Sequence, residues 1–227
     1  MARKINATSF RLNILRAWES RWFVPAALRP RLLEEDVAIR ELVKGRLKQA
    51  GIIAVEIERS ANNCRIIIKA ARPGIVIGRG GKGIEELTKA IRDTVAKLRA
   101  RRASSEPVSV NVSVVELPRG DISAAVVAQN IVADLEKRYK FRRTMKKHLD
   151  ETKSYRGVKG VKIRIAGRLD GNEHSRAESL TSGSLPLNTL RADIDLGEAV
   201  AHMTYGVLGI KVWIYKGEKF TEKERVL

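Results

Sequence analysis

The sequence predicts an α+β protein with two modest domains, and three observations support this prediction. The chain has 227 residues, and 44% of them are hydrophobic, so two domains can each bury a core. Short stretches in which apolar residues alternate, as in strands, lie between longer stretches with helical spacing. The segment Pro118 to Gly120 separates the two halves and reads as a hinge.

The charge of the chain indicates a polyanionic partner. Its formal net charge is +18, far more than solubility requires, and nucleic acid is the expected ligand. An anionic membrane surface would compete, but no apolar run approaches the roughly 20 residues that span a bilayer. Cys64 is the only cysteine, which favours a reducing compartment. The three histidines are scattered, so we expect no metal site and no cofactor.

The first half of the chain alternates between the two kinds of pattern. We expect a helix within Arg31 to Ala50, with Asp36 as its N-cap and Gly51 as its stop. A helix with apolar residues at Ile84, Leu87, Ile91, Val95 and Leu98 comes later. The expected strands are Ile52 to Glu58, Cys64 to Lys69 and Pro107 to Leu117.

A glycine-rich stretch precedes that second helix. Pro73-Gly74 predicts a turn, and Gly78, Arg79, Gly80, Gly81 and Lys82 follow after three apolar residues. Glycines allow close approach of the backbone, and a cation at the start of a helix suits a phosphate. The spacing Gly78-x-x-Gly81 is that of the clamp by which KH domains grip nucleic-acid backbone.

Three other readings of these glycines are weaker. Gly78, Gly80 and Gly83 match a dinucleotide fingerprint, but no full strand precedes them and no acid follows at the required distance. A phosphate loop of the Walker type needs Ser or Thr after Gly81-Lys82, where Gly83 stands. A turn without a ligand remains open on spacing alone. The element order of helix, two strands, two helices and strand is that of a type II KH domain, which favours the clamp.

We therefore assign residues 31–117 to a type II KH domain and residues 1–30 to an N-terminal arm. Trp18, Trp22 and Phe23 lie close together in this arm, where they either stack on bases or, as we expect, pack on a partner as anchors. Residues 118–120 form the hinge, residues 121–216 a second α/β domain with a small mixed or antiparallel sheet, and residues 217–227 a charged tail.

The second domain is less regular. We expect Asp121 to cap a helix. The remaining expectations are a helix at Phe141 to Thr152, a strand at Val161 to Ile165, a loop at Asp170 to Ser184, a strand at Leu190 to Leu196, a helix at Gly197 to Tyr205 and a strand at Gly209 to Lys216.

The densest positive charge lies at Lys137 to Lys147, where seven of eleven residues are basic. On a helix, Arg142, Arg143 and Lys146 share one surface, with Lys147 beside them. Solvated helix faces normally mix signs, and the nearest acids along the sequence are Glu136 and Asp150. This surface is therefore a candidate site for an anionic ligand rather than a merely solvated face.

No catalytic constellation is visible. Asp193 and Asp195 share a face of an expected strand, but no nucleophile or histidine accompanies them in the sequence. Arg191 is their expected counter-charge. We therefore predict that the chain is not an enzyme.

Several stretches together resemble one family, the KH-bearing small-subunit ribosomal protein three in its bacterial form. The resemblance covers about Phe10 to Gly217. The stretches that carry it are FRLNI at Phe10 to Ile14, W-x-S-x-WF at Trp18 to Phe23, ARPGIVIG at Ala71 to Gly78, FRRTMK at Phe141 to Lys146, GVKI at Gly160 to Ile163, PLNTLRADID at Pro186 to Asp195 and AHMTYGVLGIKVWIYKGE at Ala201 to Glu218. The clamp interior Arg79-Gly80 departs from the basic pair usual in the family.

The resemblance implies a structural protein of the small-subunit head that binds ribosomal RNA and lines the channel through which mRNA enters. It implies that Arg142, Arg143 and Lys146 help to unwind structured mRNA, and that neighbouring small-subunit proteins, usually ten and fourteen, contact the second domain. It places the chain in cytoplasmic ribosomes, with no membrane and no small-molecule substrate. An alternative is a KH-type RNA chaperone or regulator that acts off the ribosome. A third hypothesis, a nucleic-acid lyase, lacks a nucleophile that the sequence singles out.

Overall fold

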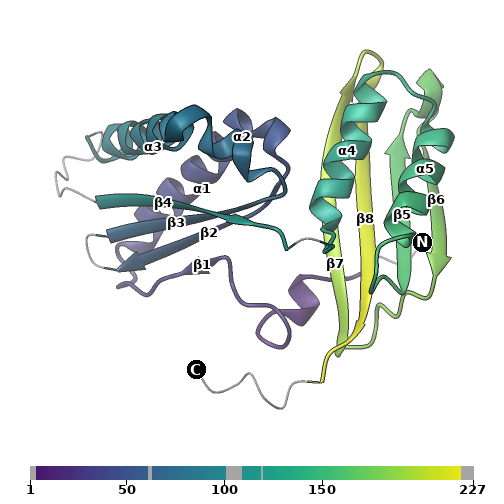
Figure 1. Cartoon of the computed structure of the whole chain (residues 1–227), viewed down its shortest axis with the longest axis horizontal. Helices are drawn as coiled ribbons and strands as arrows, with labels where there is room; N and C mark the ends of the chain where they lie inside the picture. Colours follow the sequence, from purple (N-terminus) through teal and green to yellow (C-terminus); the bar gives the residue numbers. More distant parts are fainter. Residues whose placement is uncertain (1–3, 61–62, 101–108, 119, 221–227) are drawn as a thin grey trace. The chain divides into compact units, whose positions relative to one another are not determined.

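The computed structural model describes residues 4–60, 63–100, 109–118 and 120–220. The chain divides into two compact units (Figure 1): Trp18–Leu117, called the KH unit here, and Met1–Ala17 together with Pro118–Leu227, called the C-terminal unit. Residues 1–3 of the predicted arm, Arg119 of the hinge and residues 221–227 of the tail lie outside the described residues. The predicted five-part division of the chain stays a prediction.

The KH unit contains one four-stranded sheet, ordered β1-β2-β3-β4. Its pairs β1/β2 and β3/β4 are parallel, and β2/β3 is antiparallel. The elements are β1 (Ser20–Arg21), α1 (Arg29–Arg46), η2 (Lys48–Ala50), β2 (Ile52–Ser60), β3 (Asn63–Ala70), α2 (Pro73–Ile77), η3 (Arg79–Gly81), α3 (Lys82–Ala100) and β4 (Ser109–Glu116). The order from α1 to β4 confirms the predicted type II KH arrangement.

Helical spacing explains the core of the KH unit. Leu87, Ile91 and Val95 follow one another at intervals of four along α3, and all three are buried against the sheet. Ile39 and Val43 of α1 are also four residues apart, and both are buried in the same core. Gly51 has φ +67°, a left-handed conformation that glycine adopts without strain, and β2 begins directly after it as predicted.

Two local predictions in this unit are wrong. Helix α1 begins at Arg29 rather than at Asp36, because Pro30 favours the first helical turn and Asp36 instead turns its side chain inward. Pro73-Gly74 does not form a separate turn, since Pro73 is the first residue of α2. Proline starts a helix well because the first turn needs no backbone N–H from it.

The C-terminal unit contains an antiparallel sheet ordered β6-β5-β8-β7. Its elements are η1 (Ser9–Arg11), α4 (Ala124–Glu136), α5 (Phe141–Lys153), β5 (Gly160–Gly167), η4 (Leu169–Gly171), β6 (Arg176–Gly183), β7 (Ala192–Met203) and β8 (Gly206–Glu218). Helices α4 and α5 cover one face of the sheet (Figure 1), and their apolar residues form its core with alternate residues of β5 and β8.

The two ends of this sheet contain the largest errors of the sequence-based prediction. The expected helix at Gly197 to Tyr205 is instead most of the long strand β7, which pairs with β8 over its whole length. Pairing and burial override the helical preference of Glu198 and the alanines there. The expected loop at Asp170 to Ser184 contains the edge strand β6, whose polar composition suits an exposed edge.

Charged side chains tie the N-terminal segment and α4 to this unit. Asp195 pairs with Arg16 at 2.7 Å and accepts a hydrogen bond from the backbone N–H of Ala124 at 2.7 Å, so it satisfies the start of α4 in place of the predicted cap Asp121. Arg191, the expected counter-charge of the two aspartates, pairs with Glu218 instead. Asp193 pairs with Lys219.

Candidate nucleic-acid interface

The glycine-rich turn joins α2 to α3 through two close backbone contacts. A Cβ atom on Gly83 would lie 2.7 Å from the carbonyl oxygen of Val76 and 2.9 Å from that of Ile77. A Cβ atom on Gly78 would lie 2.9 Å from the nitrogen of Gly83. Glycine is therefore required at both positions so that the start of α3 can lie against the end of α2.

The interior of the turn faces solvent. Gly80 and Gly81 have φ values of +64° and +82°, and nothing lies within 4 Å of the Cβ atom that either could carry. Arg79 and Lys82 are exposed, and neither forms an ion pair with any described residue. The turn thus presents accessible backbone and two available cations, as a phosphate-binding clamp requires.

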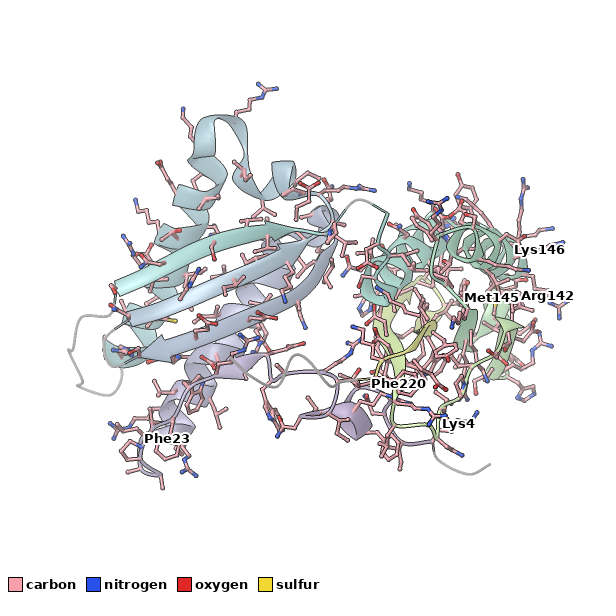
Figure 2. The ribbon with its side chains drawn as sticks, turned by 60° about the horizontal axis from the view of Figure 1, so that its bottom comes forward. Lys4, Phe23, Arg142, Met145, Lys146 and Phe220 are labelled. Carbon is pink, nitrogen blue, oxygen red and sulfur yellow. The ribbon has the colours of Figure 1, made fainter. Side chains whose placement is uncertain are left out.

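Helix α5 separates its residues into a buried and a basic face. Phe141, Met145 and Leu149 are buried in the core of the C-terminal unit. All four predicted basic residues, Arg142, Arg143, Lys146 and Lys147, are exposed. Figure 2 shows Arg142 and Lys146 projecting outward from the helix.

Two of these four cations have carboxylate partners that lie far away in the sequence. Arg142 donates to the two carboxylate oxygens of Glu178 on β6 at 3.1 and 3.0 Å. Lys147 lies 3.3 Å from a carboxylate oxygen of Asp134 on α4. Hydrogen bonding between Arg142 and Glu178 raises the pKa of the guanidinium and lowers that of the carboxyl group. The predicted one-signed surface is therefore partly neutralised.

Arg143 and Lys146 are the two cations of this face that remain available. Neither forms an ion pair within the described part of the chain. They lie three residues apart on α5, so their side chains are neighbours on the helix surface. Like charges at this spacing are unfavourable in the absence of an anion, which keeps the pair a candidate site for phosphate.

A buried histidine fixes the position of α5 against α4. The two ring nitrogens of His148 lie 3.0 Å from Asp134 and 3.2 Å from Glu151. Burial tends to raise the pKa of Asp134, but hydrogen bonds from His148 and Lys147 hold it below its ordinary value. These contacts orient the basic face, and local sequence patterns do not reveal the contact with Asp134 because that residue belongs to α4.

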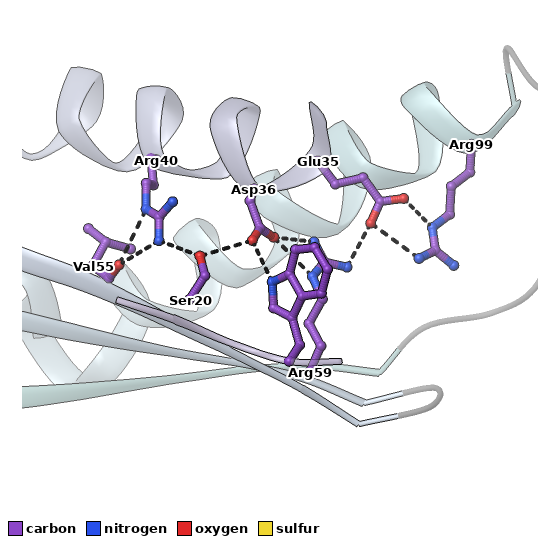
Figure 3. Close-up of polar contacts among 8 residues, drawn as sticks. Ser20, Glu35, Asp36, Arg40, Val55, Arg59 and Arg99 are labelled. Atoms are coloured by element: carbon purple, nitrogen blue, oxygen red, sulfur yellow. Dashed lines mark hydrogen bonds and ion pairs between the residues drawn. The ribbon is translucent and has the colours of Figure 1, made fainter. Parts of the chain in front are cut away.

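A second network that sequence reasoning missed holds the KH unit together (Figure 3). The guanidinium of Arg59 on β2 lies 2.8 Å from Glu35 and 2.6 Å from Asp36, both on α1. Glu35 also accepts from Arg99 of α3 at 2.8 Å. Burial alone would lower the pKa of Arg59, but Asp36 holds it above its ordinary value. The network joins both long helices to the sheet that positions the glycine turn.

The three aromatic residues of the N-terminal segment behave differently from one another. The indole N–H of Trp22 donates to Asp36 at 3.0 Å, so Trp22 is held within the KH unit itself. Trp18 is 56% exposed and Phe23 is 92% exposed. Both side chains are therefore accessible to a partner molecule, and the expectation that they pack on one stays a prediction.

Among the residues that the structure describes, no helix has both the length and the apolar character to span a membrane. The same residues contain no group of three or more acidic, cysteine or histidine side chains placed to hold a metal ion.

The fold and the exposed basic groups define a KH-domain RNA-binding protein. Two family models match the chain, a KH domain at residues 38–121 and the C-terminal domain of ribosomal protein S3 at residues 131–214. The small ribosomal subunit protein uS3 of Shouchella clausii is 42% identical to it, and the match covers 99% of this chain and 98% of that protein.

The proteins of the same name from Acidobacterium capsulatum and Desulforamulus reducens are 43% and 44% identical, over 99% of this chain and 95% and 96% of theirs. The chain therefore belongs to the uS3 family of small ribosomal subunit proteins. This confirms the resemblance that the sequence motifs indicated.

Proposed function

We propose that this chain is a structural, non-enzymatic protein of the small ribosomal subunit that binds ribosomal RNA in the cytoplasm. Family membership, the net charge of +18 and the KH fold support this role. The resemblance in its motifs further points to the head of the subunit, at the channel through which mRNA enters, with proteins ten and fourteen as neighbours.

The unpaired cations of α5 carry the mRNA part of the proposal. Arg143 and Lys146 are exposed on α5, which is held in place by its buried face and by His148. Such a pair contacts phosphates irrespective of sequence, as a surface that meets every message must do. Arg142 joins them when the anion competes successfully with Glu178, whose ion pair with Arg142 is exposed and weak.

The glycine turn supplies the second contact. We assign Gly78, Arg79, Gly80, Gly81 and Lys82 to the grip on ribosomal or messenger RNA backbone. Nothing lies within 4 Å of the Cβ positions of Gly80 and Gly81, so a ligand can approach this backbone beside two cations that form no ion pair in the described chain. The single arginine in the clamp interior makes Arg79 the residue on which this grip depends most.

A fractionation experiment tests the proposal. In a sucrose gradient of cell lysate, the chain should travel with small subunits and withstand a moderate salt wash. The variant Arg143→Ala/Lys146→Ala should also enter subunits but crosslink less to mRNA. The matched control is Arg46→Ala/Lys48→Ala, which removes the same two charges from an exposed part of the KH unit. A chain that stays at the top of the gradient would instead support the chaperone or regulator acting off the ribosome.

A further inference from the structure

The face of the C-terminal sheet opposite α4 and α5 carries a compact basic surface. Val161, Ile163 and Ile165 of β5 are buried under the helices, so Lys162 and Arg164, which alternate with them, point to the other side. On β8, Lys211 and Trp213 lie directly beside them, because Lys162 pairs with Trp213 and Arg164 with Lys211. We call this side, with Lys4, the open face.

The open face has more positive charge than its acids can balance. Lys211 is paired with Glu198 at 2.8 Å. Neither Lys162 nor Arg164 nor Lys4 forms an ion pair with any residue that the structure describes. Partial burial lowers the pKa of Lys162, and the adjacent Lys4 and Arg164 lower it further. Cations opposite one another on a sheet repel, so an anion between them would be stabilising.

The remaining side chains of the open face suit a nucleic acid. The Lys162 ammonium lies over the Trp213 ring, 6.0 Å from its centre, and Trp213 is only partly buried against the apolar cluster at the end of this face, so part of an aromatic ring lies beside the cations. Ser179 and Thr181 of β6 are the strand partners of Arg164 and Lys162, and they add hydroxyl groups to the same face. RNA-binding sheets combine cations with an aromatic platform in this way.

We propose that the open face is a second RNA-binding surface, on which Lys4, Lys162 and Arg164 hold phosphates of an RNA strand that crosses the sheet beside Trp213. Lys162 and Arg164 are two residues apart on one strand, about 6.6 Å, a spacing comparable to that of successive phosphates. An acidic protein segment could match that spacing, but the Trp213 ring and the hydroxyl groups of Ser179 and Thr181 beside the cations suit the bases and sugars of RNA better than a run of carboxylates.

This surface is independent of the α5 site. Figure 2 shows Lys4 on the side of the C-terminal sheet away from helix α5, which carries Arg142 and Lys146. The N-terminal segment covers one end of the same side, where Ala7 packs on Ile194 and Tyr215. This segment thereby holds Lys4 beside Lys162. The C-terminal unit would contact two separate segments of RNA, one on each side of its sheet.

The test measures how the affinity of the full chain for a mixed-sequence single-stranded RNA depends on salt, by fluorescence anisotropy. The open-face variant is Lys4→Gln/Lys162→Gln/Arg164→Gln. Its control, Lys44→Gln/Arg46→Gln/Lys48→Gln, replaces two lysines and one arginine that are exposed in the KH unit. Three lost phosphate contacts should reduce the slope of log affinity against log salt by about two, and the control should leave it near the original value.

Two further measurements distinguish an effect of charge from an effect on folding, and an RNA ligand from an acidic protein ligand. The conservative variant Lys4→Arg/Lys162→Arg/Arg164→Lys should keep the original slope, which would exclude a merely structural effect. Polyglutamate at the same charge concentration should displace RNA poorly from the original chain. An unchanged slope in the open-face variant, an equal loss in the control, or equally effective displacement by polyglutamate would each overturn the proposal.

Discussion

Replacing Arg59 by methionine should destabilise the KH unit by about 3 kcal/mol. The Arg59 side chain is 7% exposed and makes its hydrogen bonds to Glu35 and Asp36 at 2.6 to 2.9 Å. Removing one partner of a buried ion pair costs about 3–5 kcal/mol, because an uncompensated charge remains. Methionine keeps most of the volume of the side chain, so the measured change reports mainly the lost charge.

We expect a loss at the lower end of this range because one of the two carboxylates keeps a charged hydrogen-bond donor after Arg59 is replaced. Glu35 retains its hydrogen bonds to Arg99 at 2.8 and 3.2 Å, so its charge stays compensated. Asp36, 1% exposed, retains only two neutral donors, the indole of Trp22 and the hydroxyl of Ser20. A single carboxylate is therefore left without a counter-charge.

Urea denaturation followed by tryptophan fluorescence measures the effect. A Trp213→Phe background restricts the signal to Trp18 and Trp22, both in the KH unit. The added change Asp36→Asn removes the uncompensated charge and should recover at least about 1 kcal/mol, a coupling typical of residues in one network. A loss below about 1 kcal/mol for Arg59→Met, or strictly additive effects in the double variant, would refute the reasoning.

Three other changes give separate tests. Gly83→Ala should lower the free energy of unfolding by about 2 kcal/mol in urea, because its Cβ atom would overlap the carbonyl oxygen of Val76. Glu178→Gln should strengthen RNA binding by up to about fivefold in anisotropy titrations, since it releases Arg142. Asp134→Asn should cost about 1 kcal/mol at pH 7 in thermal or urea unfolding. Because the folded pKa of Asp134 is depressed, this stabilisation is fully present above its unfolded pKa of about 3.9, and the difference should shrink as the pH falls from there through the folded pKa.

Matched variants control for general effects. Gly74→Ala is the control for the glycine change, because nothing lies within 4 Å of a Cβ atom at that position. Glu41→Gln, on an exposed part of α1, removes the same charge as Glu178→Gln. Equal gains in RNA affinity from both glutamine variants would contradict a specific release of Arg142. A difference for Asp134→Asn that does not shrink as the pH is lowered below about 3.9, the pKa of an ordinary aspartate, would contradict the ion-pair origin of its effect.

The sequence predicted those elements whose pattern agrees with their burial. In α3 and β5 the regularly spaced apolar residues are the ones that pack into the core, so the sequence pattern located both elements within a few residues. Strand β7 was mistaken in part for a helix because Glu198 to His202 has helical composition, while its strand conformation depends on pairing with β8. Such pairing joins residues that are distant in sequence, and local propensity does not encode it.

In the candidate site, too, local spacing predicted some features, whereas contacts between residues distant in sequence could not be predicted. The exposure of Arg142, Arg143 and Lys146 followed from helical spacing. The pairing of Arg142 with Glu178 could not be predicted, because Glu178 lies in a stretch expected to be a loop and reaches α5 only through the sheet. The open face depends on strand register in the same way, since it was the pairing of β5 with β8 that placed Trp213 beside Lys162.

The most direct test of the central claim is the rate at which ribosomes carrying Arg143→Ala/Lys146→Ala translate a message with a stable hairpin, relative to an unstructured message. The account predicts slower translation of the hairpin message only, with normal assembly of small subunits and with the control Arg46→Ala/Lys48→Ala unaffected. Equal rates on both messages, or equal slowing of both, would contradict a role of these cations in holding incoming mRNA.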